Sequence, residues 1–149
     1  MSKTTIDGEV SKPARILALD YGRARIGLAI ASAETALAQP LGTLERINRN
    51  EDMRRLRELL REHGVRQIVV GLPLRMSGAE GTQSEKMRGF AEELRKKFGL
   101  PVHLWDERLT SAEANRFLRE TELSIEKRGK AVDRMAAVLI LQGWMQRRR

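Results

Sequence analysis

The sequence predicts an α/β fold with one mixed, five-stranded sheet whose first three strands are antiparallel and whose two faces both carry helices. Three apolar runs near the N-terminus are joined by short turns, as in antiparallel strands. Two later apolar runs each follow a segment with helical spacing, as in parallel strands reached through helices. The 149 residues suffice for one domain. We expect a flexible tail over residues 1–13 and the folded domain over 14–149.

The first three strands are predicted from two apolar runs and one weaker, interrupted run. Arg15–Tyr21 is an apolar run that ends in a carboxylate, and Ile26–Ala31 is a second run. The turn Gly22–Arg25 is short enough to make them an antiparallel hairpin. Ala36–Glu45 is a weaker strand that Pro40 interrupts, so it suits an edge of the sheet.

A first helix is expected between an N-capping residue and a terminating glycine. Asn50 is a good N-cap, and Glu51 and Asp52 in the first turn suit the helix dipole. Gly64 ends the helix. The apolar residues at helical spacing are Met53, Leu56, Leu59 and Leu60.

The next strand and helix follow in the same way. Gln67–Val70 is a short apolar strand, and a glycine-rich loop, Ser77–Gly81, comes after it. Thr82 and Glu85 form a capping box that opens a helix. Its expected buried face consists of Met87, Phe90, Ala91 and Leu94.

The C-terminal part supplies the fifth strand and two helices. Pro101–Trp105 is the strand, and a capping box of Thr110 and Glu113 begins a helix that runs through Arg119. Residues 121–130 are highly charged, and we expect a mobile loop there. The last helix carries Val132, Met135, Ala136, Leu139, Ile140 and Gly143.

Composition limits the kind of protein and site. Hydrophobic residues make up 41% and charged residues 32%, as in a globular protein. No apolar run approaches the ~20 residues of a membrane helix, and no apolar region suggests a secretory signal, so we expect a cytoplasmic protein without membrane partners. Cysteine is absent, which excludes disulfides, thiolate zinc sites and a cysteine nucleophile. With only His63 and His103, any metal should be a hard cation held by carboxylates.

The net charge of +8 favours a polyanionic partner, because each neutralised phosphate releases counterions. The alternative is a basic surface without a specific ligand. Nucleic acid is therefore a candidate that charge alone does not decide.

Three carboxylates interrupt otherwise apolar elements. Asp20 ends a strand, Glu107 follows another strand, and Asp133 lies near the start of the last helix. Ligands collect at the carboxyl ends of strands in open α/β sheets, and three acids converging there would suit Mg²⁺ or Mn²⁺. Each acid also has a structural alternative. Asp20 could start a turn, Glu107 could pair with Arg108, and Asp133 could satisfy the helix dipole.

Four blocks of the sequence resemble, in order, those of the YqgF/RuvX family. They are Asp20–Ala29, Gly71–Pro73, Asp106–Thr110 and Ala131–Ala137. The family consists of bacterial ribonuclease H-like nucleases, described as Holliday-junction resolvases and as pre-16S ribosomal RNA nucleases. The resemblance runs from about Arg15 to the C-terminus.

The resemblance implies a ribonuclease H-like fold and an acidic site of Asp20, Glu107 and Asp133. Phosphodiester hydrolysis with one or two Mg²⁺ or Mn²⁺ ions would follow. As groups that neutralise substrate phosphates we consider Arg23, Arg25, Arg108 and Arg128.

Three alternatives stay open. One is an endonuclease of DNA junctions, and another is a non-catalytic RNA-binding factor of ribosome assembly. The last is a nucleotide-binding relative of sugar kinases and actin, which needs two lobes where 149 residues provide one. We expect pre-ribosomal RNA ahead of DNA junctions, with ribosomal subunits as further candidate partners. The sequence leaves the oligomeric state open.

Overall fold

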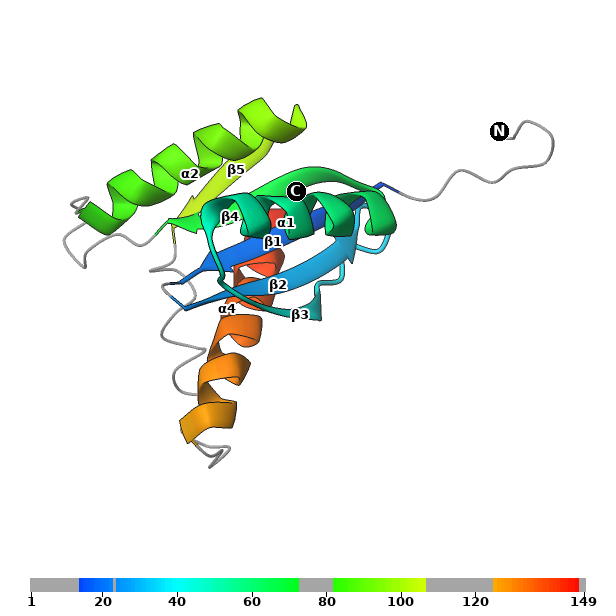
Figure 1. Ribbon diagram of the computed structural model, residues 1–149. Coiled ribbons are helices and arrows are strands. Elements are labelled where there is room, and N and C mark those ends of the chain that lie inside the picture. The colour runs from blue at the N-terminus through cyan, green and yellow to red at the C-terminus, as the bar shows by residue number, and fades with distance from the viewer. Residues whose placement is uncertain (1–13, 23, 73–81, 107–124, 148–149) are drawn as a thin grey trace.

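The computed structural model describes residues 14–22, 24–72, 82–106 and 125–147, with the backbone alone described at 82–83 and 125–133 (Figure 1). The predicted tail over residues 1–13 and the predicted helix over 110–119 lie outside these ranges.

Five strands form one sheet in the order β3-β2-β1-β4-β5. The pairs β1–β2 and β2–β3 are antiparallel, whereas β1–β4 and β4–β5 are parallel, which confirms the predicted mixed sheet. The strands are β1 (Arg15–Tyr21), β2 (Arg25–Ser32), β3 (Gln39–Glu45), β4 (Val65–Leu72) and β5 (Val102–Asp106).

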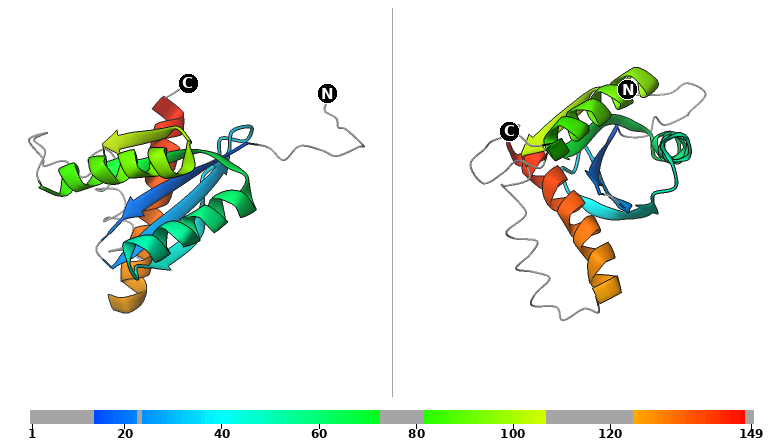
Figure 2. Two further views of the ribbon diagram at one scale, coloured as in Figure 1. Left: turned by 45° about the horizontal axis from the view of Figure 1, so that its top comes forward. Right: turned by 60° about the vertical axis from the view of Figure 1, so that its left-hand side comes forward.

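Helices cover both faces of the sheet (Figure 2). The described helices are α1 (Arg49–His63), α2 (Thr82–Phe98) and α4 (Ile125–Arg147). Helices α1 and α2 bury residues in one core, and α4 buries residues in a second core. We call the corresponding sides of the sheet the α1/α2 face and the α4 face.

Strand β1 supplies both cores because successive side chains point to opposite faces. Leu17 and Leu19 belong to the core on the α1/α2 face. Ile16 and Ala18 belong to the core on the α4 face. This alternation explains why the run is apolar throughout instead of alternating with polar residues.

The start of α1 differs from the prediction. The N-cap is Asn48, whose backbone is extended and whose side-chain oxygen accepts the N–H of Glu51 at 2.8 Å. The predicted N-cap, Asn50, is instead the second residue of the helix. A capping side chain must lie just before the first helical residue, so the earlier asparagine takes the role. The predicted end is confirmed, because Gly64 is the C-cap at φ 64°.

Two further boundaries differ by about three residues or more, whereas the ends of β2, β4 and β5 shift by only one or two. Helix α4 begins at Ile125, so the loop predicted over 121–130 is wrong from residue 125 onward, and residues 121–124 lie outside the description. This first part of α4 is polar but contains strong helix formers such as Glu126 and Lys127, which apolar spacing does not reveal. Strand β3 begins at Gln39 instead of Ala36, whose left-handed φ of 54° does not fit a strand.

Within the described ranges, no helix is long and apolar enough to cross a membrane.

Candidate active site

Asp20 lies at the carboxyl end of β1, on the α4 face. It follows Ile16 and Ala18 at the two-residue spacing of a strand, and both of those side chains pack against the core that α4 completes. The next residue, Tyr21, packs on the opposite face. Asp20 is half-buried, and its cross-strand partner is Gly27, which has no side chain to cover it. The position expected from the sequence is therefore confirmed, although its chemical role is a separate question.

The carboxyl end of β5 meets the same edge of the sheet. Strands β1, β4 and β5 are parallel, and Asp106, the last residue of β5, is in register with Leu72 of β4. Glu107 follows Asp106 directly in the chain but lies outside the described residues. The structure thus brings the end of β5 to the edge that carries Asp20 and leaves Glu107 itself untested.

Helix α4 contains Asp133, of which only the backbone is described. Position 133 precedes Ala137 by four residues and Ile140 by seven, which is the spacing of one helix face. Ala137 and Ile140 are both 0% exposed in the core between α4 and the sheet. Position 133 therefore belongs to the helix face that packs on the sheet.

Among the described side chains, no group of three or more histidines and carboxylates is close enough to hold a metal ion. Two members of the predicted triad, Glu107 and Asp133, have no described side chains, so the triad stays a prediction. The predicted donor set is made only of carboxylate oxygens, which fits a hard divalent cation.

A hollow of about 550 Å³ lies at the same edge on the α1/α2 face. It opens between the start of α1, the first half of α2 and the end of β1. Three of its side chains are cationic, and two are aromatic. The lining residues are Tyr21, Gly22, Arg46, Arg49, Lys86, Met87, Gly89 and Phe90.

Two aromatic rings and a guanidinium group pack together along one side of the hollow. The rings of Tyr21 and Phe90 lie with their centroids 4.1 Å apart, and the Arg46 guanidinium lies 4.3 Å from the Tyr21 centroid. Arg46 also donates to the Gly22 carbonyl at 3.0 Å. Burial raises the pKa of the Tyr21 phenol above its ordinary value of 10.0, and the Arg46 charge opposes part of that rise.

Asp52 fixes the loop that carries Arg46. Its side chain is almost fully buried and accepts the Ile47 N–H at 2.9 Å and an Arg55 N–H at 2.7 Å. Its second oxygen lies 3.6 Å from Arg46 Nε. The sequence assigned Asp52 only to the helix dipole, whereas the structure makes it an anchor for the basic wall of the hollow.

The predicted phosphate-binding arginines have mixed outcomes. Arg25 begins β2, is half-buried, lies at the edge that carries Asp20, and is in register with Glu45 of β3. Arg23 and Arg108 lie outside the described residues, and Arg128 is in α4 with an undescribed side chain.

Sequence reasoning did not select Arg46, Arg49 and Lys86, which line the hollow. The predicted strand topology could have identified the two arginines. Because β3 returns antiparallel to β2, its end and the start of α1 must reach the edge where β1 ends.

Comparison with known proteins agrees with this fold. The family described as "RuvX: Holliday junction resolvase" matches residues 14–147. In structure, the chain resembles "T. thermophilus RuvC in complex with Holliday junction substrate" with a TM-score of 0.56. That match has 14% identity and covers 91% of this chain and 95% of the other, so it bears on the fold alone. The ribonuclease H-like fold expected from the resemblance is confirmed.

Close relatives carry one common name, "Putative pre-16S rRNA nuclease". The protein from Koribacter versatilis is 58% identical and is matched over 90% of this chain and 88% of its own length. Those from Anaeromyxobacter sp. (strain Fw109-5) and Moorella thermoacetica are 46% and 45% identical. These matches cover 90% and 89% of this chain and 98% and 95% of the relatives. The chain therefore belongs to the RuvX family.

Proposed function

We propose that this chain is a nuclease that hydrolyses phosphodiester bonds of pre-16S ribosomal RNA during ribosome assembly. The observation that carries the proposal is the position of Asp20 at the carboxyl edge of the sheet, on the face that α4 covers. The relatives named pre-16S rRNA nucleases, at up to 58% identity, support the choice of substrate.

The proposed catalytic carboxylates are Asp20, Glu107 and Asp133. Asp20 and the end of β5 share one edge of the sheet, and position 133 lies on the helix face that packs on the sheet. Membership of the family implies a divalent metal in general, and oxygen donors favour Mg²⁺ or Mn²⁺. When bound, such an ion lowers the pKa of an attacking water and neutralises charge on the phosphate.

The basic side chains of the hollow have the complementary role. Arg46, Arg49 and Lys86 lie on the α1/α2 face beside the end of β1. A phosphodiester backbone that crosses this end would meet cations on one side and Asp20 on the other. Asp52 and the Gly22 carbonyl hold Arg46 in place for this contact. Arg25 and the other predicted arginines remain candidates for the same task.

A DNA-junction resolvase is the second candidate function, and the description of the matching family favours it. We prefer RNA as the substrate because relatives at 58% and 45% identity are named pre-16S rRNA nucleases. Interaction with ribosomal subunits and a cytoplasmic location belong to the same proposal.

The test is single-turnover cleavage by the purified full chain, with Mg²⁺ and with chelator. The substrates are an RNA that spans the 5′ end of 16S ribosomal RNA and a four-way DNA junction. We expect metal-dependent cleavage of the RNA by the wild type and none by Asp20→Asn, which should still bind RNA in chelator because binding relies on cations.

Asp106→Asn is the matched control. Asp106 ends a strand at the same edge, but Val102 and Leu104 at two-residue spacing place it on the α1/α2 face. It should retain cleavage. Wild-type rates in Asp20→Asn would remove Asp20 from the site, and cleavage of the junction alone would favour the resolvase.

A further inference from the structure

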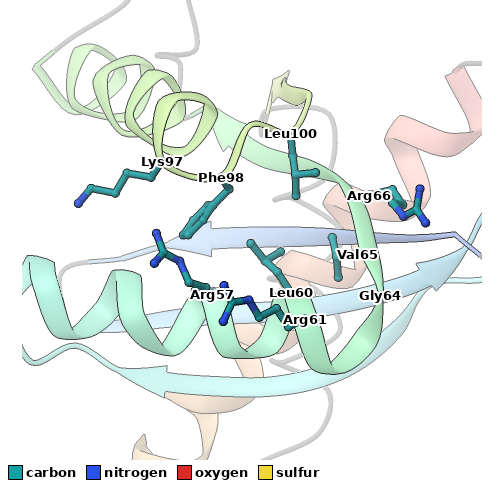
Figure 3. Close-up of a pocket in the computed structure, with 9 residues that line it drawn as sticks. All are labelled: Arg57, Leu60, Arg61, Gly64, Val65, Arg66, Lys97, Phe98 and Leu100. Carbon is teal, nitrogen blue, oxygen red and sulfur yellow. The ribbon is translucent and has the colours of Figure 1, made fainter.

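A second basic hollow of about 560 Å³ lies at the opposite edge of the sheet (Figure 3). It is formed by the last turns of α1 and α2 and by the beginning of β4. Arg57 and Phe98 face one another across it in Figure 3, and Lys97 extends along its rim. The full lining is Arg57, Leu60, Arg61, Gly64, Val65, Arg66, Lys97, Phe98 and Leu100.

The described residues around the hollow leave its positive charge without carboxylate partners. Its cations, Arg57, Arg61, Arg66 and Lys97, are all exposed. Within the described part of the chain, none of these four forms an ion pair with a carboxylate, whereas other basic residues of the same helices do. Those paired residues are Arg49, Arg54, Arg55 and Arg95. A cluster of unpaired cations around a concave site attracts a polyanion.

The floor of the hollow is apolar and includes an aromatic ring. Leu60 and Val65 are buried, and Phe98 is half-buried. The Arg57 guanidinium lies 5.6 Å from the centroid of the Phe98 ring. An aromatic ring beside a guanidinium can stack an unpaired base, and the surrounding cations can hold its phosphates. This combination favours single-stranded nucleic acid over a duplex, whose bases are already stacked.

The length of β4 sets the least distance that one RNA molecule must span to reach both ends of the sheet. Strand β4 starts at Val65 beside this hollow, and its register with β1 places Gly71 beside Asp20. Six residues of strand span about 20 Å. Because β4 is buried, an RNA must pass around the helices to reach both ends, and at about 3.4 Å per stacked nucleotide it needs more than roughly six nucleotides.

We propose that the hollow between the ends of α1 and α2 is a second RNA-binding site, which holds a single-stranded flank more than roughly six nucleotides from the cleaved bond. The choice of RNA and the location relative to cleavage rest on the proposed function, whereas binding of single-stranded nucleic acid by the hollow does not.

The experiment uses fluorescence anisotropy with the full chain, chelator and a labelled, unstructured 16-nucleotide RNA (a length chosen to exceed the roughly six-nucleotide span). The variant is Lys97→Gln, and the matched control is Lys96→Gln. The two neighbours are both exposed on α2 and lose the same charge, but only Lys97 lines the hollow.

Loss of one phosphate contact should reduce the slope of log Kd against log salt by about 0.7. We expect this reduction in Lys97→Gln, about twice as much in Arg61→Gln/Lys97→Gln, and little change in Lys96→Gln. Phe98→Leu should weaken binding roughly 5-fold or more while keeping the slope, because it removes a stacking surface and no charge.

Equal slopes in the Lys96 and Lys97 variants would overturn the proposal. It would also fail if Lys97→Gln abolished binding of AMP but left RNA binding unchanged, since the hollow would then be a mononucleotide site. Unchanged RNA binding in the double variant would point to an acidic protein partner instead. The binding assay contains chelator, so its result does not depend on metal-dependent cleavage. A chain that binds RNA as expected in this assay but does not cut RNA with Mg²⁺ would refute only the nuclease proposal.

Discussion

Gly143 permits α4 to approach the end of β5. A Cβ added at Gly143 would lie 2.8 Å from Cζ2, 3.2 Å from Cε2 and 3.5 Å from Cη2 of Trp105. Trp105 is only 9% exposed, so its ring has little room to move. It directly precedes Asp106, the last residue of β5. Gly143→Ala should therefore strain the contact between α4 and β5 near the proposed catalytic edge.

The magnitude follows from two opposing effects. Replacing glycine with alanine inside a helix adds up to about 1 kcal/mol of stability. Overpacking a filled core costs about 1–3 kcal/mol. Gly89→Ala in α2 isolates the first effect, because its added Cβ would meet nothing within 4 Å. The free energy of unfolding of Gly143→Ala should thus lie about 1–3 kcal/mol below that of Gly89→Ala.

Urea unfolding of both variants measures this difference, and a double-mutant cycle tests its cause. Trp105→Phe removes the outer indole atoms that face Gly143, so Gly143→Ala should cost less in that background. Equal stabilisation by both alanine substitutions would refute the packing argument. An unchanged cost in the Trp105→Phe background would show that the strain arises elsewhere.

Three further predictions concern the α1/α2 face. Asp52→Ala should lower the free energy of unfolding by about 2–3 kcal/mol, because buried hydrogen bonds to Arg55 and the backbone are lost. A loss below about 0.5 kcal/mol in urea unfolding would contradict this. Tyr21 is the only tyrosine, so its phenol can be titrated by ultraviolet absorbance, with a midpoint expected above 10.0 and higher still in Arg46→Gln. The folded state then holds this proton more tightly than the unfolded state, so stability should fall as pH rises past 10.0, and a midpoint below 10.0 would oppose the burial argument. Gly64→Ala should cost about 1 kcal/mol at its left-handed φ, and Gly64→Asn less, whereas equal unfolding free energies for both would contradict a backbone origin.

Much of the fold could be predicted from local patterns. Apolar runs identified the strands, and helix-linked strands implied parallel pairing, as β4 and β5 show. Boundaries were harder, because Asn48 and Asn50 are both suitable caps and only the backbone decides between them. The polar beginning of α4 lacks the apolar spacing by which a helix is recognised.

A candidate site residue could be predicted where a charged side chain interrupts an apolar segment. Asp20 was found because a carboxylate ends an apolar strand, and the structure places it at the expected edge. Arg46 and Lys86 carry no such contrast in a chain with 28 lysines and arginines. The predicted strand topology could have indicated Arg46, whereas selecting Lys86 requires knowing that the start of α2 also lies beside β1, which is a property of the tertiary fold.

The central claim is that carboxylates from three distant segments share one metal site, which holds one or two divalent ions. Thermal melting of the wild type, Asp20→Asn and Asp133→Asn, each with chelator and with Mg²⁺, tests it most directly. Without metal, the amide variants should melt above the wild type, because one of three repelling charges is gone. At ten times Kd, Mg²⁺ should stabilise the wild type by about 1.4 kcal/mol and both variants much less. Equal Mg²⁺-induced shifts in all three proteins would contradict a shared site.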